Sequence, residues 1–292
     1  MIPNILNKGD TIGIIAPASG SDAETFNTYI ANMKNLGFNI IEGKNMRNSD
    51  FYLSASDLER AHDFNEMFRN KDVKAIICFR GGYGSMRMID HIDLSLIKRN
   101  PKFFCGYSDI TLLLNYINAK TNLVTFHGPV VKSNFCDSLT RESLIETLTT
   151  PLKDKIIDFS TFPEVMSFNE DIVNSPIVGG NLSIICSSLC TPYEIDTHKK
   201  ILLIEEVNEA PYSIDRMLTQ LKCAKKLNSC SGFLIGHLTP KNPELLQVVL
   251  SILLPLNKPI LVGLPIGHSY PNLTIPIGLK CTVDFHCKKI IF

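Results

Sequence analysis

A serine stands at the junction between an apolar run and a helical pattern in Phe103–Thr111. Phe103–Gly106 predicts a buried strand that ends in glycine, and Ser108 follows two residues later. In a nucleophile elbow, such a turn exposes the hydroxyl, and the amides at the helix N-terminus stabilise an oxyanion. Ile110 stands where the G-x-S-x-G pattern has its last glycine, so this stretch alone favours a simple helix N-cap.

A second turn with chemical potential is the glycine-rich segment Arg80–Gly84, which follows the predicted strand Lys74–Phe79. Glycines let a backbone approach a ligand and leave amides available to a phosphate or an oxyanion. The segment is neither a Walker loop nor a complete G-x-G-x-x-G, and a tight turn without a ligand is an equal alternative. The guanidinium of Arg80 could bind a carboxylate with two hydrogen bonds.

A serine nucleophile needs a base, and one of the seven histidines suits that role best. His268 stands in a loop with glycine and proline after the apolar run Pro259–Leu264, although a lone loop histidine is more often incidental. His127 is a weaker candidate near another turn. The other histidines have ordinary explanations in polar helices, turns or strand ends: His62, His91, His198, His237 and His286.

An acid that orients the base is available at the end of the predicted strand Lys200–Ile204. Glu205 and Glu206 follow directly, and strand alternation sends them to opposite faces. One of the two is therefore expected to point into a cleft, and a solvated strand end is the alternative.

The elements that must position these residues alternate between β-branched runs and amphipathic stretches, which predicts βαβ units and a largely parallel sheet in the first half. One expected helix is capped by Ser54 or Ser56 and buries Leu58, Ala61, Phe64 and Met67. The strand before Ser108 is expected over Lys102–Gly106. The other expected strands are Thr11–Ala16, Phe38–Glu42, Gly232–Ile235, Pro259–Val262 and Cys281–Phe285. The other expected helices are Ala23–Leu36, 109–120, 181–189 and Ile214–Leu221.

Composition sets the broad class and the division into domains. The 292 residues carry 29 basic and 29 acidic side chains, so no global field attracts nucleic acid or an anionic membrane. The odd number of cysteines, nine, without a C-x-x-C pair gives little support for a metal site and indicates a reducing compartment. No signal peptide is expected, which predicts a cytoplasmic protein. The hydrophobic periodicity weakens over residues 136–174. This predicts that the segment connects two domains, at 1–135 and 175–292.

Taken together, these stretches resemble the LD-carboxypeptidase family of serine peptidases, also called muramoyltetrapeptide carboxypeptidases. The resemblance runs in order along nearly the whole chain. The segments that carry it are Lys8–Asp10, Ala16–Ser19, Phe79–Gly84, Asn100–Lys102, Gly106–Thr111, Thr125–Pro129, Gly179–Ser183, Thr191–Tyr193, Ile204–Met217, Gly267–His268 and Asn272–Gly278. It departs from the usual pattern at Cys190, at Glu206 and at Ser269–Pro271.

The resemblance implies a fold and a catalytic set. It implies an α/β fold with a Rossmann-like (flavodoxin-like) N-terminal domain and a smaller mixed α/β C-terminal domain. The family's nucleophile, glutamate and histidine fall on Ser108, Glu205 and His268, and the oxyanion donors on the amides of Gly82 and Asp109. We also expect substrate contacts from three further residues: Arg80, Tyr83 and Asn181. No metal or other cofactor, a homodimer and a cytoplasmic location are implied.

The implied substrate is a cytoplasmic murein tetrapeptide, which loses its terminal D-Ala from the L-centre of a diamino acid during peptidoglycan recycling. A second branch of the family hydrolyses microcin C-type peptidyl nucleotides, although Pro211–Arg216 looks more like the murein branch. A non-catalytic ligand-binding α/β protein is the remaining alternative.

Overall fold

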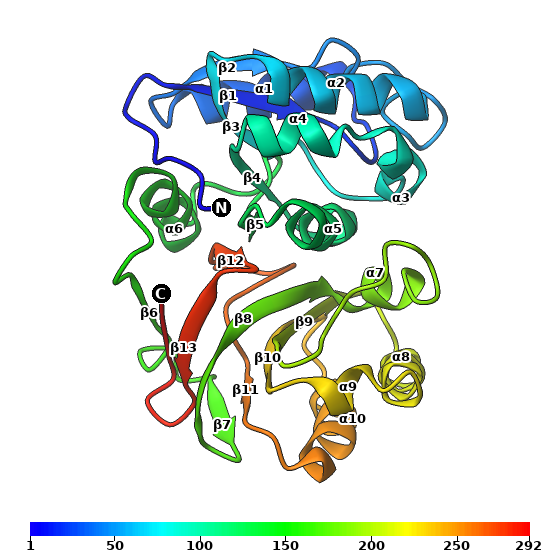
Figure 1. The fold of residues 1–292 in the computed structure, drawn as a ribbon, viewed down its shortest axis with the longest axis vertical. Coiled ribbons are helices and arrows are strands. Elements are labelled where there is room, and N and C mark those ends of the chain that lie inside the picture. Colours follow the sequence, from blue (N-terminus) through cyan, green and yellow to red (C-terminus); the bar gives the residue numbers. More distant parts are fainter. The chain divides into compact units, whose positions relative to one another are not determined.

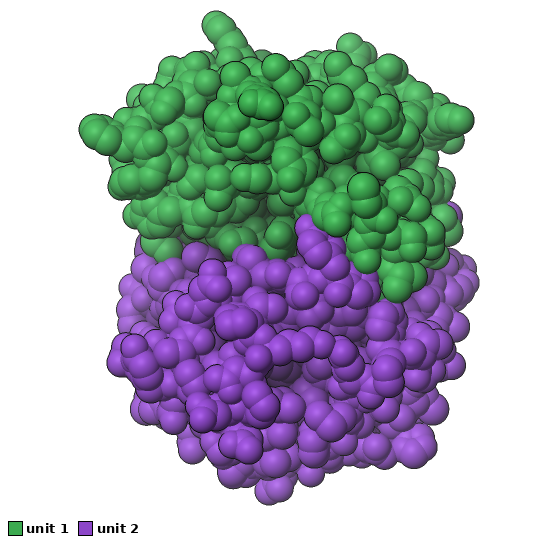
Figure 2. Space-filling view, turned by 180° about the vertical axis from the view of Figure 1, so that it is seen from behind, with its two compact units in different colours: residues 1–150, 273–276 green, residues 151–272, 277–292 purple.

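The computed structural model describes residues 1–292, which divide into two compact units. Unit 1 contains residues 1–150 and 273–276, and unit 2 contains residues 151–272 and 277–292 (Figure 2). The segment 136–174, which we expected to connect two domains, contains α6 (Ser138–Thr149) in unit 1, and two strands and the beginning of a third in unit 2. The predicted limits of the domains themselves stay a prediction.

Unit 1 is built on a six-stranded sheet with the order β12-β5-β4-β3-β1-β2 (Figure 1). The pairs from β2 to β5 are all parallel, and their order is that of the flavodoxin-like doubly wound fold. This confirms the predicted α/β, Rossmann-like N-terminal fold. The strands are β1 (Thr11–Ile15), β2 (Asn39–Glu42), β3 (Val73–Cys78), β4 (Phe103–Gly106), β5 (Thr125–His127) and β12 (Ile275–Ile277).

The helices of unit 1 follow the strands in the βαβ manner. They are α1 (Ala23–Lys34), α2 (Asp57–Arg69), α3 (Ser85–Met88), α4 (Leu94–Arg99), α5 (Thr111–Thr121) and α6, with short 3-10 helices at Ile89–His91 and Ser108–Ile110. Ser56 caps α2 through a capping box with Glu59, as one of the two predicted caps. The predicted buried face of α2 is wrong at one position, because Leu58 is 65% exposed and Arg60 is only 2% exposed.

The strand order fixes where unit 1 can bind a ligand. In a parallel sheet the carboxyl ends of all strands lie at the same edge. A crevice opens at this edge between the two strands where the strand order reverses. Here the order reverses between β1 and β3, because β2 lies on the other side of β1. The segments that follow β1 and β3 therefore flank this crevice, and the segment that follows β4 lies next to them.

Unit 2 contains an eight-stranded mixed sheet with the order β6-β14-β13-β8-β9-β10-β11-β7. Strands β8 to β11 are parallel, and the strands at both ends of the sheet are antiparallel to their neighbours. This agrees with the predicted mixed α/β domain. The strands are β6 (Ile156–Asp158), β7 (Met166–Phe168), β8 (Ile172–Asn181), β9 (Ile201–Val207), β10 (Gly232–Thr239), β11 (Ile260–Val262), β13 (Lys280–Asp284) and β14 (Lys289–Ile291).

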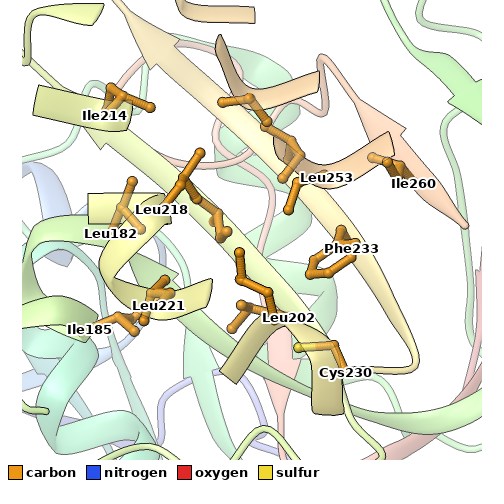
Figure 3. Close-up of a cluster of buried hydrophobic side chains, with 14 of the residues drawn as sticks. Leu182, Ile185, Leu202, Ile214, Leu218, Leu221, Cys230, Phe233, Leu253 and Ile260 are labelled. Carbon is orange, nitrogen blue, oxygen red and sulfur yellow. The ribbon is translucent and has the colours of Figure 1, made fainter. Parts of the chain in front are cut away.

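A hydrophobic core fixes the helices of unit 2 on the parallel strands (Figure 3). The helices are α7 (Leu182–Ser187), α8 (Pro211–Cys223), α9 (Lys226–Ser229) and α10 (Pro243–Leu253), followed by a 3-10 helix at Leu254–Leu256. Leu218 and Leu253 from two of these helices are fully buried in one cluster with Phe233 of β10. None of the helices in either unit combines the length and the apolar character needed to cross a bilayer.

Candidate functional site

The turn after β4 places Ser108 in a strained backbone conformation. Tyr107 is extended, and Ser108 has a φ of 64°, in the left-handed region. This region costs an L-residue other than glycine about 1–2 kcal/mol, and such strain gathers at functional sites. The side chain of Ser108 caps neither the 3-10 helix that it begins nor α5 behind it. The N-cap interpretation is therefore wrong, and the turn has the backbone of a nucleophile elbow.

Gly106 shows how the elbow tolerates Ile110 in place of the last glycine of the pattern. A Cβ atom added to Gly106 would lie 2.8 Å from Cγ2 of Ile110. The bare backbone of Gly106 therefore leaves room for the isoleucine, which is fully buried.

The weaker candidate base, His127, lies fully buried in β5 with its ring centroid 6.1 Å from that of Tyr107.

The glycine-rich segment after β3 lies directly against Ser108. A Cβ atom on Gly81 would lie 2.7 Å from Cβ and 2.9 Å from Oγ of Ser108. Gly82 has a φ of 116°, and a Cβ atom there would lie 2.3 Å from Oγ of Ser19. The amide of Tyr83 donates to the same hydroxyl at 3.3 Å. Ser19, which lies in the segment Ala16–Ser19 but was not predicted as a site residue, thus joins the segments that follow β1 and β3.

Gly82→Ala is expected to destabilise the protein, because it combines a strained φ with a methyl group against Ser19. The backbone alone contributes about 1–2 kcal/mol, which corresponds to a fall in the thermal midpoint of several degrees. Thermal unfolding followed by circular dichroism measures the effect. In the double variant Ser19→Gly/Gly82→Ala, the clash is removed, while the backbone cost stays and the hydrogen bond from the Tyr83 amide is lost. An unchanged midpoint for Gly82→Ala would contradict this geometry.

Of the predicted substrate ligands, Arg80 lines a hollow of about 580 Å³ in unit 1, and Tyr83 contacts Tyr52, another residue of its lining. Arg80 lines this hollow together with Ser19 and Tyr52, and its Nη1 donates to the carbonyl of Gly20 at 3.2 Å. Tyr83 is half exposed, and its ring meets that of Tyr52 edge-on at 5.7 Å. The two residues are therefore available to a ligand, and the contacts expected of them stay a prediction.

Two buried charged side chains organise the loops around Ser108. Asp109 accepts from the amide of Ser85 at 2.8 Å, and the hydroxyl of Ser85 donates to the Asp109 carbonyl at 2.8 Å. Burial raises the pKa of the Asp109 carboxyl above its ordinary value. The guanidinium of Arg60 donates to the carbonyls of Pro17 and of Gly84, and so links the segments after β1 and β3. Sequence reasoning missed Arg60, because its carbonyl partners carry no side-chain signal.

In unit 2, the structure brings together two of the predicted residues, His268 and Glu205. Nδ1 of His268 lies 2.5 Å from Oε2 of Glu205. The Glu205 side chain is fully buried, whereas that of His268 is 15% exposed. A Cβ atom on Gly267 would lie 2.5 Å from the same Oε2, so the glycine makes room for the carboxylate. A carboxylate on Nδ1 fixes the imidazole tautomer and leaves Nε2 to act as a base.

Glu206 points to the opposite side of the strand, as the alternation predicted. It accepts from Nδ2 of Asn181 at 2.9 Å, from the amide and hydroxyl of Ser183 at 2.7 Å each, and from the Val207 amide at 2.8 Å. Oδ1 of Asn181 accepts from the amide of Ile184 and caps α7. Asn181 is thus a buried helix cap, and the substrate contact expected of it stays a prediction.

The predicted site residues are divided between the two units. Ser108, Gly82 and Asp109 lie in unit 1, and Glu205 and His268 lie in unit 2. A triad formed by all three side chains stays a prediction. No group of three or more His, Cys, Asp or Glu side chains is arranged to hold a metal ion.

Comparison with known proteins identifies the family. Residues 12–128 match the LD-carboxypeptidase N-terminal domain, and residues 174–283 match the LD-carboxypeptidase C-terminal domain. The chain is 40% identical to a probable murein peptide carboxypeptidase of Bacillus subtilis, over 97% of this chain and 91% of the relative. The solved structure of the microcin C7 self-immunity protein MccF in its wild-type apo state matches with a TM-score of 0.91 at 27% identity, covering 100% of this chain and 98% of that one. The muramoyltetrapeptide carboxypeptidase of Oxalobacter formigenes matches with a TM-score of 0.83 at 26% identity, covering 96% and 97% of the two chains. The chain therefore belongs to the LD-carboxypeptidase family of serine peptidases and is a hydrolase.

Proposed function

We propose that this protein is a serine carboxypeptidase that removes the terminal D-Ala of a murein tetrapeptide from the L-centre of its diamino acid. The observation that carries the proposal is the strained turn at Ser108, in a chain 40% identical to a relative named as a probable murein peptide carboxypeptidase. The buried Glu205 carboxylate on His268 supports the proposal from the other unit.

In the proposed reaction, Ser108 Oγ attacks the carbonyl carbon of the last peptide bond while Nε2 of His268 accepts its proton. Glu205 holds the Nδ1–H and stabilises the imidazolium that forms. The amides of Gly82 and Asp109 donate to the oxyanion. His268 then gives the proton to the amine of D-Ala as the bond breaks, and water, deprotonated by the same imidazole, hydrolyses the acyl-enzyme.

The remaining parts of the proposal concern binding and location. Arg80 receives the terminal carboxylate, because a guanidinium can donate two parallel hydrogen bonds to it. The protein acts as a cytoplasmic homodimer on peptides that are recycled from the cell wall. Light scattering of the purified protein and fractionation of the producing cells test these two points.

A peptidyl-nucleotide hydrolase is the second candidate, and the TM-score of 0.91 with the microcin C7 self-immunity protein favours it. We therefore propose parallel assays with a murein tetrapeptide and an aspartyl adenylate, with products identified by mass spectrometry. The expected result is release of D-Ala and a higher kcat/KM for the tetrapeptide. Cleavage of the adenylate alone would replace the murein substrate by the second candidate. Binding of either compound without any cleavage would indicate the non-catalytic alternative.

A further inference from the structure

His237 lies in β10, next to the strand that carries Glu205, at a point where the pairing of the two strands is irregular. Ile235 pairs with Ile204 and Leu238 pairs with Glu206, so Gly236 and His237 together stand opposite Glu205. Two residues opposite one make a β-bulge, which bends the strand and redirects a side chain. A Cβ atom on Gly236 would lie 2.5 Å from the carbonyl oxygen of Ile266, so the glycine lets the bulge approach the loop of His268.

Two hydrogen bonds connect this bulge to the loop, one just before His268 in the chain and one just after it. The backbone amide of His237 donates to the carbonyl of Ile266 at 2.8 Å, two residues before His268. The amide of Ser269, one residue after His268, donates to Nδ1 of His237 at 3.1 Å. A third bond closes the loop, because Oδ1 of Asn272 accepts from the amide of Gly267 at 2.9 Å.

The bond from Ser269 specifies the protonation state of His237. Since an amide N–H donates to Nδ1, that nitrogen carries no proton, and the neutral ring carries its proton on Nε2. Burial lowers the pKa of His237 to about 4. The charged and titratable groups that face the ring partly offset one another, because Glu205 and Glu164 raise its pKa whereas Lys241 and His268 lower it. The ring is therefore neutral, and able to accept, above about pH 4.

We propose that His237 is a positioning residue, which holds the loop of His268 so that the imidazole keeps its bond to Glu205. The inference rests on the proposed function in one respect, namely that His268 is the base of the reaction. Protonation of His237 turns Nδ1 from an acceptor into a donor, so the bond from Ser269 is lost and this end of the loop is released.

A matched pair of variants tests the acceptor itself. In His237→Asn, the Oδ1 atom takes the place of Nδ1 and accepts from Ser269, whereas His237→Leu keeps the bulk of the side chain without an acceptor. We expect His237→Leu to lower kcat for D-Ala release about 10- to 100-fold with little change in KM, since misplacing a catalytic group by about 1 Å has this effect. We expect His237→Asn to stay within about threefold of the wild type. The control Lys241→Gln removes a charge that faces the ring and should leave kcat unchanged.

Hydrogen exchange of the Ser269 amide gives a readout that does not depend on turnover. We expect protection in the wild type and in His237→Asn, and none in His237→Leu. In the wild-type protein this protection should fall as the pH drops through about 4, where His237 takes up its proton. In His237→Asn it should persist over the same range.

The outcomes separate the two proposals. Protection of Ser269 that is insensitive to pH between 6 and 3.5 in the unmodified protein, or full kcat for His237→Leu, would overturn the positioning role. If the wild type releases no D-Ala, the proposed function fails, and the exchange of Ser269 alone decides whether His237 holds the loop.

Discussion

Ser108→Ala is expected to abolish release of D-Ala from a murein tetrapeptide, with a fall in kcat of at least about 10⁴-fold. The variant removes the only atom that can form the acyl-enzyme in the proposed reaction, while the turn and the amides of Gly82 and Asp109 stay in place. Binding of the tetrapeptide, measured by calorimetry, should therefore persist. Full activity of Ser108→Ala would exclude this serine as the nucleophile.

Ser108→Gly extends the same experiment to the backbone. Glycine adopts a φ of 64° without the cost that serine bears, so this variant should be at least as stable as the wild type although it is inactive. Ser251 provides the matched control, because it is exposed in the last turn of α10. Ser251→Gly should cost about 0.5–1 kcal/mol in the free energy of unfolding. Chemical denaturation measures the free energy of unfolding of both variants. Equal losses in Ser108→Gly and Ser251→Gly would contradict a strained turn at Ser108.

The second large effect is expected at Glu205, with its neighbour Glu206 as the control. Glu205→Gln replaces the carboxylate on Nδ1 of His268 by an amide that can hold the ring in the wrong tautomer. The corresponding change in a serine protease triad lowers kcat about 10⁴-fold, and we expect a loss of this size.

Glu206→Gln should lower the stability of the protein and leave kcat nearly unchanged. Its carboxylate accepts four hydrogen bonds from Asn181, Ser183 and Val207, and an amide cannot satisfy all of these donors. We expect a loss of about 1–3 kcal/mol in the free energy of unfolding, with kcat per folded molecule kept within a few-fold. Denaturation curves and active-site titration separate the two effects. A reversed pattern would show that Glu206, and not Glu205, supports the base.

Much of the fold follows from local pattern alone. The strands β1, β3 and β4 are short, almost continuously apolar runs, and the helices α1 and α2 show helical periodicity. The structure confirms all five within a few residues. The strands β5, β6, β7, β12 and β14 were not predicted, because a run of three residues gives little measurable period. The ten-residue strand β8 was not predicted either, because Pro176, Gly179 and Gly180 are residue types that are depleted in strands. The strand β12 also contains Pro276, which is typical of an edge strand rather than of a strand interior.

The candidate site shows the same limit at the level of single residues. Residue types and flanking glycines identified His268 and the pair Glu205 and Glu206, and only tertiary pairing decides which carboxylate the imidazole meets. His237 received an ordinary explanation because its partner, Ser269, lies 32 residues further along the chain. The left-handed φ of Ser108 leaves no trace in the sequence, since the energy that maintains it comes from the packing of neighbouring segments.

The path of the chain also determines how this protein can be divided. Residues 273–276 belong to unit 1 although 151–272 and 277–292 form unit 2, so no single cut separates the units. A fragment that ends at residue 150 would lack β12 and would expose β5 as an open sheet edge, which invites aggregation. A gene fusion or a split reporter built at that boundary would therefore have to supply β12 again, by joining a second copy of residues 273–277 to the first segment through a linker.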